Sequence, residues 1–294
     1  MNRCKIAERD YPQVKTSTDI NAALDDDRVS AVIIVLPARL HYNIAKMALM
    51  KRKHVLIEKP LTSSVLESKE LIEIAKNHHL VLMVDHTYLY SASINKMKEI
   101  LTGKNNSIKH IESNRSNLGL FRNDVNVIWD LAPHDLSIIE YLSESKPKKV
   151  SAVGYSHNKL GIVDTAYISL IYDDFTAGVK VSWISPKKER QITIVTNENM
   201  IVFDDLLKEG KIELHSAGFK ETDKGITCWN EGMQRISATE KEPLSTMLDD
   251  FIDAIETGKE PISNSAIGLD IVRILEATEL SLSKDGMYVR VCYN

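Results

Sequence analysis

The chain has 294 residues, of which 43% are hydrophobic and 27% are charged, and its formal net charge is -4. This length suits about two globular domains, and a slight negative charge without any lysine- and arginine-rich block argues against nucleic-acid binding. No apolar run approaches the ~20 residues that a membrane helix needs, and the three cysteines form no CxxC pair. We therefore expect a cytoplasmic protein without disulfides, a thiolate metal site or a membrane segment.

The first third of the chain alternates between short apolar segments and helix-like segments, a pattern typical of βαβ units. The predicted strands are 31–36, 54–57 and 80–84. Helices are expected between them, and Thr62 or Ser63 is expected to cap the second. Because both faces of these strands are apolar, the pattern predicts a parallel sheet covered by helices.

The spacing of apolar residues changes after a predicted helix at 93–101. The turn-rich segment 103–107 predicts a domain boundary, with domains at 1–104 and 105–294. Alternating segments at 165–172, 177–183 and 192–196 then predict antiparallel strands with one buried face, and two helices are expected at 244–256 and 266–283. The predicted fold class is α/β plus α+β: an incomplete Rossmann domain with a doubly wound parallel sheet, then an open-faced, mostly antiparallel sheet domain with helices.

One element of a dinucleotide-binding domain is missing from the sequence. Such a domain begins with a strand and a glycine-rich turn, whose backbone holds the pyrophosphate at a helix N-terminus. No GxGxxG occurs here, and none of the 12 glycines precedes Gly103. We therefore expect the chain to start inside the Rossmann domain, to leave the edge of strand 31–36 uncovered, and to bind NAD(H) weakly.

Polar residues follow two consecutive predicted strands. The segment from Pro37 to His41 follows the first, and Glu58, Lys59 and Pro60 follow the second. Ligands of open α/β sheets bind outside the carboxyl ends of the strands, so both segments are expected at a ligand crevice. The structural alternatives are a helix start for the first segment and a solvated turn with an ion pair for the second.

A second candidate lies in NVIWDLAPHDL, where Asp130 and His134 are four residues apart and would share one helical face. Proline is tolerated in the first turn of a helix, so Pro133 predicts a helix that begins at or just after Asp130. The pair could be a helix cap and an ordinary first-turn histidine. The apolar neighbours argue for partial burial, and buried ionisable groups are costly unless they are paired or used.

The EKP motif after a strand, PxxxH one βα unit earlier and DxxxH after the predicted boundary together resemble the Gfo/Idh/MocA oxidoreductases. The resemblance runs from about residue 5 to the end, and the family's first strand, glycine-rich turn and second strand have no counterpart. It implies NAD or NADP as cofactor and oxidation or reduction of a secondary alcohol in a sugar or nucleotide sugar. It also implies a homo-oligomer that covers the open sheet face.

The resemblance assigns roles to the motif residues. Lys59, Asp130 and His134 match the family's catalytic residues, with His134 as acid/base, Lys59 polarising the substrate oxygen, and Asp130 orienting His134 or the substrate. Removal of a hydride from a carbinol carbon requires loss of the hydroxyl proton, so a base within hydrogen-bond reach is needed. The residues expected on the cofactor side are Pro37, His41, Glu58 and Lys59.

Substrate contacts are expected from Arg115, Arg122 and Tyr88. Arginine offers paired donors for a phosphate or carboxylate, although both arginines could instead form surface salt bridges and Tyr88 could serve packing. No metal is expected, because no metal-ligand spacing is shown by His78, His79, His110, His157 and His215. The alternative function is a catalytically inactive binding or partner subunit, favoured by the missing phosphate turn and disfavoured by retention of all three catalytic residues.

Overall fold

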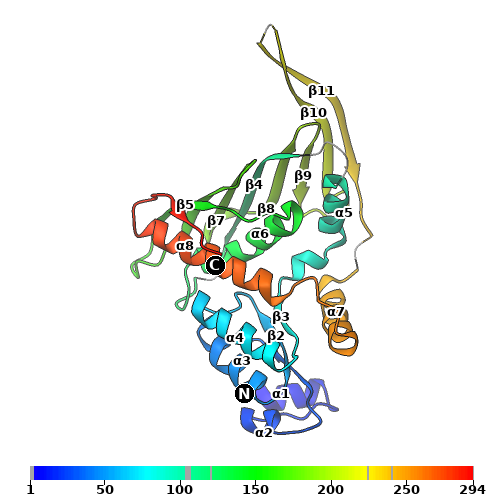
Figure 1. The fold of residues 1–294 in the computed structure, drawn as a ribbon, viewed down its shortest axis with the longest axis vertical. Coiled ribbons are helices and arrows are strands. Elements are labelled where there is room, and N and C mark those ends of the chain that lie inside the picture. The colour runs from blue at the N-terminus through cyan, green and yellow to red at the C-terminus, as the bar shows by residue number, and fades with distance from the viewer. Residues whose placement is uncertain (1–2, 103–106, 120, 224, 240, 294) are drawn as a thin grey trace.

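The structure is a computed structural model that describes residues 3–102, 107–119, 121–223, 225–239 and 241–293. A small parallel sheet with its helices lies at one end of the molecule, and a large mixed sheet lies at the other (Figure 1). The predicted fold class is confirmed by these two sheets.

The small sheet has three parallel strands in the order β1-β2-β3, as the apolar strand pattern predicted. Val55, Ile57 and Leu71 lie in its core with no exposed surface. The elements of this part are α1 (Arg3–Asp10), α2 (Ile20–Leu24), β1 (Ala31–Ile34), η1 (Ala38–Leu40), α3 (His41–Met50), β2 (His54–Glu58), α4 (Val65–Asn77) and β3 (Leu82–Asp85).

The cap of α4 differs from the prediction by one or two residues. Ser64 caps the helix, and its hydroxyl accepts from the backbone N–H of Glu67 at 3.2 Å. Thr62 has no exposed surface, so its hydroxyl needs partners within the protein. It donates to Ser64 O at 2.7 Å and lies 2.7 Å from the Ser68 hydroxyl. The capping chemistry was correct and the position was wrong.

Strand β1 forms one edge of the small sheet. Ile33 is 54% exposed and Val35 is 69% exposed, although both belong to the apolar run that predicted this strand. Parallel sheets ordinarily bury such residues on both faces. Among the described residues, this edge therefore carries apolar surface that the fold leaves in contact with solvent.

The large sheet has nine strands in the order β11-β10-β9-β8-β4-β7-β6-β5-β12. The β4–β7 pair is parallel and the other pairs are antiparallel. The strands are β4 (Ile108–Leu118), β5 (Lys149–Tyr155), β6 (Thr165–Ile171), β7 (Thr176–Ser182), β8 (Ile184–Thr196), β9 (Met200–Asp204), β10 (Ile212–Thr222), β11 (Gly225–Ile236) and β12 (Val289–Arg290).

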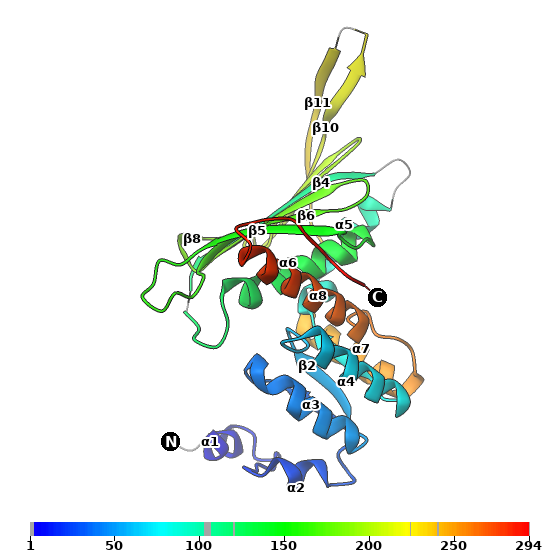
Figure 2. The ribbon, with the colours of Figure 1, turned by 60° about the vertical axis from the view of Figure 1, so that its left-hand side comes forward.

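Among the described residues, helices cover one face of the large sheet and leave the other face without a helix (Figure 2). Along β6, Ala166, Ile168 and Leu170 point to that face and are buried, whereas Tyr167 on the opposite face is 47% exposed. The hairpin of β10 and β11 extends well beyond the other strands. The helical elements of this half are η2 (Thr87–Tyr90), α5 (Ala92–Leu101), α6 (Val127–Ser143), α7 (Pro243–Thr257) and α8 (Ser265–Leu282).

Helix α8 joins the two sheets, because it packs against α4 of the first part and β5 of the second. Its residue Val272 belongs to the core of the small sheet, while Ile271 and Leu275 belong to the core of the large one. The predicted boundary between residues 104 and 105 lies outside the described residues. The division into domains 1–104 and 105–294 stays a proposal.

Candidate active site

The EKP motif lies where two parallel strands end side by side. Glu58 at the end of β2 is in register with Asp85 at the end of β3, so Lys59 and His86 follow at the same edge. Burial, and next the charge of Asp85, raises the pKa of the Glu58 carboxyl. This is the edge at which open α/β sheets bind their ligands.

Lys59 reaches from this edge to the start of α6. Its Nζ donates to the backbone carbonyl of Asp130 at 2.5 Å and lies 3.6 Å from Asp130 Oδ1. Only 12% of the Lys59 side chain and 16% of the Asp130 side chain are exposed. Burial lowers the pKa of Lys59, and the nearby carboxylate of Asp130 opposes that shift. The structure thus joins two of the three predicted catalytic residues.

Helix α6 begins earlier than Pro133 predicted. Asn126 caps the helix by accepting from the backbone N–H groups of Ile128 at 3.0 Å and Trp129 at 3.2 Å, so the helix begins at Val127. Asp130 therefore lies in the first turn and Pro133 lies inside the helix. The prediction of a first-turn proline was wrong because the Asn126 cap, which sequence reasoning overlooked, fixes the start.

The carboxylate of Asp130 has three donors around it. Arg122 Nη1 donates to Oδ1 at 3.0 Å, Trp183 Nε1 donates to Oδ2 at 3.0 Å, and the Lys59 ammonium lies near Oδ1. The described residues show no side-chain hydrogen bond between Asp130 and His134. Asp130 is therefore placed to hold Lys59 and Arg122, and no side-chain hydrogen bond supports its predicted role of orienting His134.

His134 lies one helical turn after Asp130 and is half-buried. The Tyr88 ring packs edge-on against its ring, with centroids 5.4 Å apart. Its Nδ1 is buried without a hydrogen-bond partner among the described residues. Burial, and next the charge of Lys59, lowers the pKa of His134 well below its usual range. A ring that stays neutral near pH 7 can accept a proton.

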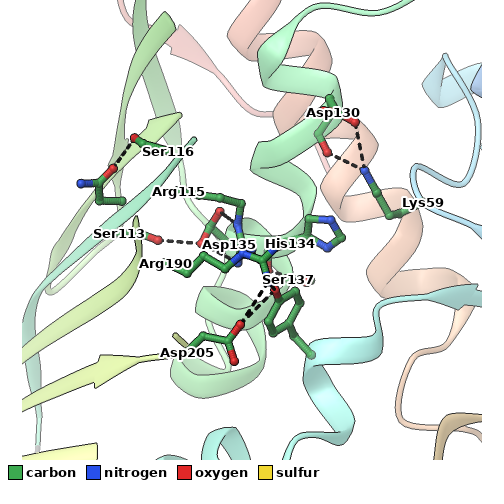
Figure 3. A network of polar contacts seen from close by, with 12 residues as sticks. Lys59, Ser113, Arg115, Ser116, Asp130, His134, Asp135, Ser137, Arg190 and Asp205 are labelled. Atoms are coloured by element: carbon green, nitrogen blue, oxygen red, sulfur yellow. Dashed lines mark hydrogen bonds and ion pairs between the residues drawn. The ribbon is translucent and has the colours of Figure 1, made fainter. Parts of the chain in front are cut away.

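A second polar group lies further along α6, around Asp135 (Figure 3). Arg115 donates to both carboxylate oxygens of Asp135, from Nε at 2.7 Å and from Nη2 at 3.2 Å. Its Nη1 donates to the Tyr88 hydroxyl at 3.0 Å, and Arg190 donates to the same hydroxyl at 3.2 Å. Arg115 and Tyr88 were predicted substrate residues, and the structure places both in this group, where Arg115 is buried and Tyr88 is half-buried.

Two cavities meet at Asp130. The first, of about 370 Å³, lies at the strand ends and is lined by Val35, Pro37, Glu58 and Lys59 among others; we call it the strand-end cavity. The second, of about 740 Å³, is lined by Asn117, Phe121, Leu131 and Trp183 among others; we call it the sheet-side cavity. The residues that line both are Arg122, Asp124 and Asp130.

The residues predicted for the cofactor side divide into two kinds. Pro37, Glu58 and Lys59 line the strand-end cavity. His41 does not line it, because its ring is 1% exposed and lies between two backbone carbonyls, with Nδ1 2.8 Å from Pro60 O and Nε2 2.8 Å from Leu36 O. His41 thus ties the segment after β1 to the segment after β2.

Sequence reasoning missed two residues of this site, one near Lys59 and one bonded to Asp130. His86 follows β3 as Lys59 follows β2, is 1% exposed, and has no partner for either ring nitrogen among the described residues. Burial, and next the charge of Lys59, lowers the pKa of His86 to about 3. The strand-end rule applied to the third strand would have found it. Trp183, which lies between β7 and β8, carried no such signal.

A dinucleotide would fit this site in part. Its nicotinamide end suits the strand-end cavity, where the apolar side chains of Val35 and Pro37 lie near the Lys59 ammonium. The pyrophosphate requires a glycine-rich turn at a helix N-terminus, and the described residues before Gly103 include no glycine. The described chain also shows no group of three residues suited to a metal ion, and no helix long and apolar enough to cross a membrane.

Comparison with known families and proteins identifies relatives over most of the chain. A family model described as oxidoreductase family, NAD-binding Rossmann fold, matches residues 2–86, and the GFO/IDH/MocA C-terminal domain matches residues 113–202. The UDP-N-acetylglucosamine 3-dehydrogenase of Acidithiobacillus ferrooxidans is 27% identical over 244 residues, which are 82% of this chain and 74% of that protein.

Two further similarities cover nearly the whole chain. The 4-carboxy-2-hydroxymuconate-6-semialdehyde dehydrogenase of a Sphingobium species is 25% identical over 291 residues, which are 94% of this chain and 86% of that protein. The structure of an Agrobacterium radiobacter oxidoreductase in complex with NAD+, L-tartaric acid and magnesium is similar in fold, with a TM-score of 0.79 and 20% identity over 98% of this chain and 88% of that one.

Proposed function

Because the chain belongs to the Gfo/Idh/MocA family of NAD-binding oxidoreductases, we propose that it oxidises or reduces a secondary alcohol of a sugar or nucleotide sugar with NAD or NADP. The relative that is named a UDP-N-acetylglucosamine 3-dehydrogenase supports this class of substrate. The observation that carries the proposal is the buried Lys59 ammonium, which Asp130 holds beside the strand-end cavity.

The side chains divide the work of proton transfer. His134, kept neutral by burial, takes the hydroxyl proton of the alcohol during oxidation and returns it during reduction. Lys59 donates a hydrogen bond to the reacting oxygen and stabilises the negative charge that develops there. Asp130 holds the lysine through its backbone carbonyl and its carboxylate. Bound NAD supplies the hydride acceptor.

Replacement of Lys59 tests this assignment. We expect Lys59→Ala to lower turnover by roughly 10²- to 10⁴-fold, because a positioned proton-transfer or hydrogen-bonding group contributes about that much. The measurement is steady-state kinetics at saturating cofactor and substrate. Lys46→Ala is the control, since Lys46 lies on the surface in an ion pair with Glu70. A change confined to KM would contradict a catalytic role for Lys59.

The second candidate function is a catalytically inactive binding or partner subunit. It is favoured by the absence of a glycine-rich phosphate turn from the sequence. In either case we expect weak NAD(H) binding, and micromolar affinity in a calorimetric titration would contradict that expectation. Turnover at millimolar NAD that disappears in Lys59→Ala separates the enzyme from the inactive subunit.

We also propose a homo-oligomer in which the helix-free face of the large sheet packs against another subunit. Exposed apolar side chains on that face support it, namely Val153, Tyr155 and Tyr167. Light scattering that gives the mass of a single chain would overturn the proposal. The cytoplasmic location is proposed from the sequence, whose three cysteines form no CxxC pair.

A further inference from the structure

Arg122 occupies an unusual position among the arginines near the site. It lies between β4 and α6 and lines both the strand-end cavity and the sheet-side cavity. Its side chain is 44% exposed, whereas that of Arg115 is 7% exposed. Arg122 can therefore meet a ligand in either cavity without any rearrangement of the core.

Carboxylates lie against two nitrogens of the Arg122 guanidinium, and the third nitrogen faces none in the described part of the chain. Nη1 donates to Asp130 Oδ1 at 3.0 Å, and Nε lies 3.5 Å from Asp124 Oδ1. Among the described residues, Nη2 has no hydrogen-bond partner. In Arg115, by contrast, Nε, Nη1 and Nη2 all donate to Asp135 or Tyr88. Arg122 thus keeps donors for an additional acceptor.

The surroundings of Arg122 combine an apolar surface with one guanidinium, which lies against the carboxylates of Asp124 and Asp130 in the same cavity. Phe121 is 47% exposed and packs edge-on against Trp183, with ring centroids 5.7 Å apart. Both rings line the sheet-side cavity together with Asn117. An aromatic ring beside a guanidinium offers a packing surface for a sugar or base and charged donors for a phosphate attached to it.

We propose that Arg122 is a specificity-determining residue that binds the diphosphate of a nucleotide-sugar substrate through its free Nη2 edge, while Asp130 keeps the guanidinium in place. This inference rests on the proposed function and adds the substrate's phosphate to it. The sheet-side cavity, which shares Arg122, Asp124 and Asp130 with the strand-end cavity, receives the phosphate-bearing part of the substrate. The arginine fork suits phosphate oxygens better than lysine does.

The test is calorimetric titration of the full chain with UDP-N-acetylglucosamine. We expect Arg122→Gln to weaken binding by roughly 10- to 100-fold, the effect of losing hydrogen bonds between charged groups. N-acetylglucosamine, which has no phosphate, should bind the variant and the original chain equally. Arg235→Gln is the matched control, because Arg235 is also an exposed, ion-paired arginine but lies on the distant β11.

Binding is measured without turnover, so failure of the proposed reaction would not affect this result. Unchanged affinity of Arg122→Gln for UDP-N-acetylglucosamine would overturn the inference, and so would a lack of binding by the original chain. A loss seen for NADH and not for the nucleotide sugar would also overturn it, because Arg122 would then serve the cofactor. Equal urea midpoints of the variant and the original chain confirm that the variant is folded.

Discussion

Asp130 and Asp135 lie five residues apart on α6 and each pairs with basic side chains, yet their surroundings differ. The Asp130 group, with Lys59 and Arg122, borders two cavities. The Asp135 group, with Arg115, is closed, and its donors and acceptors satisfy one another. Charge alone therefore does not identify a ligand site. A site needs charged groups with unused donors that face open space.

The largest expected effect comes from making the same change in the two groups. Asp135→Ala should reduce the free energy of unfolding by about 3–5 kcal/mol, because the buried Arg115 charge loses its partner. Asp130→Ala should cost under about 2 kcal/mol, since Lys59 keeps the backbone carbonyl and Arg122 is partly exposed, but it should reduce turnover. Urea unfolding and kinetics of both variants make the comparison. Equal losses of stability would erase the distinction between the groups.

A smaller effect is expected from the buried imidazole of His86, which lies near Lys59. Burial keeps its folded pKa at about 3, below the ordinary 6.5, so between these values the unfolded chain binds a proton that the folded chain does not. Stability is therefore lost as the pH falls below about 6.5, by roughly 1.4 kcal/mol per pH unit for this group.

His86→Phe should remove this contribution. Between pH 7 and pH 5 the variant should lose roughly 2 kcal/mol less free energy of unfolding than the original chain. Urea unfolding at several pH values measures the two slopes, and their difference isolates His86 from the carboxylates. Parallel slopes would show that His86 titrates alike in the folded and the unfolded chain, as an accessible histidine does.

The smallest expected effect concerns a single hydrogen bond in the closed group. The Ser113 hydroxyl, which is fully buried, donates to Asp135 Oδ1 at 2.7 Å. Ser113→Ala should cost about 1 kcal/mol of unfolding free energy, the usual contribution of such a bond, and should leave turnover unchanged. Urea unfolding and kinetics measure both. A clear loss of turnover in a variant that remains folded would mean that the Asp135 group also takes part in the reaction.

The sequence predicted the architecture and the strand-end motif better than it predicted the roles of individual side chains. Lys59 and Asp130 could each be singled out in advance because strand ends and helical spacing follow from local periodicity. The sequence could not show that Arg115 is buried in an ion pair whereas Arg122 is partly exposed. Burial in turn depends on long-range packing of β4 against α6, which no local pattern encodes. The helix start inferred from Pro133 was wrong because Asn126 caps the helix seven residues earlier.

The contacts of His41 have a consequence for motion. One imidazole ring holds both Leu36 O and Pro60 O at 2.8 Å, so the two segments that border the strand-end cavity cannot separate without breaking a shared contact. They should open as one cooperative unit, and their amide hydrogens should exchange with solvent at similar rates. The two segments that border the strand-end cavity are therefore expected to move together.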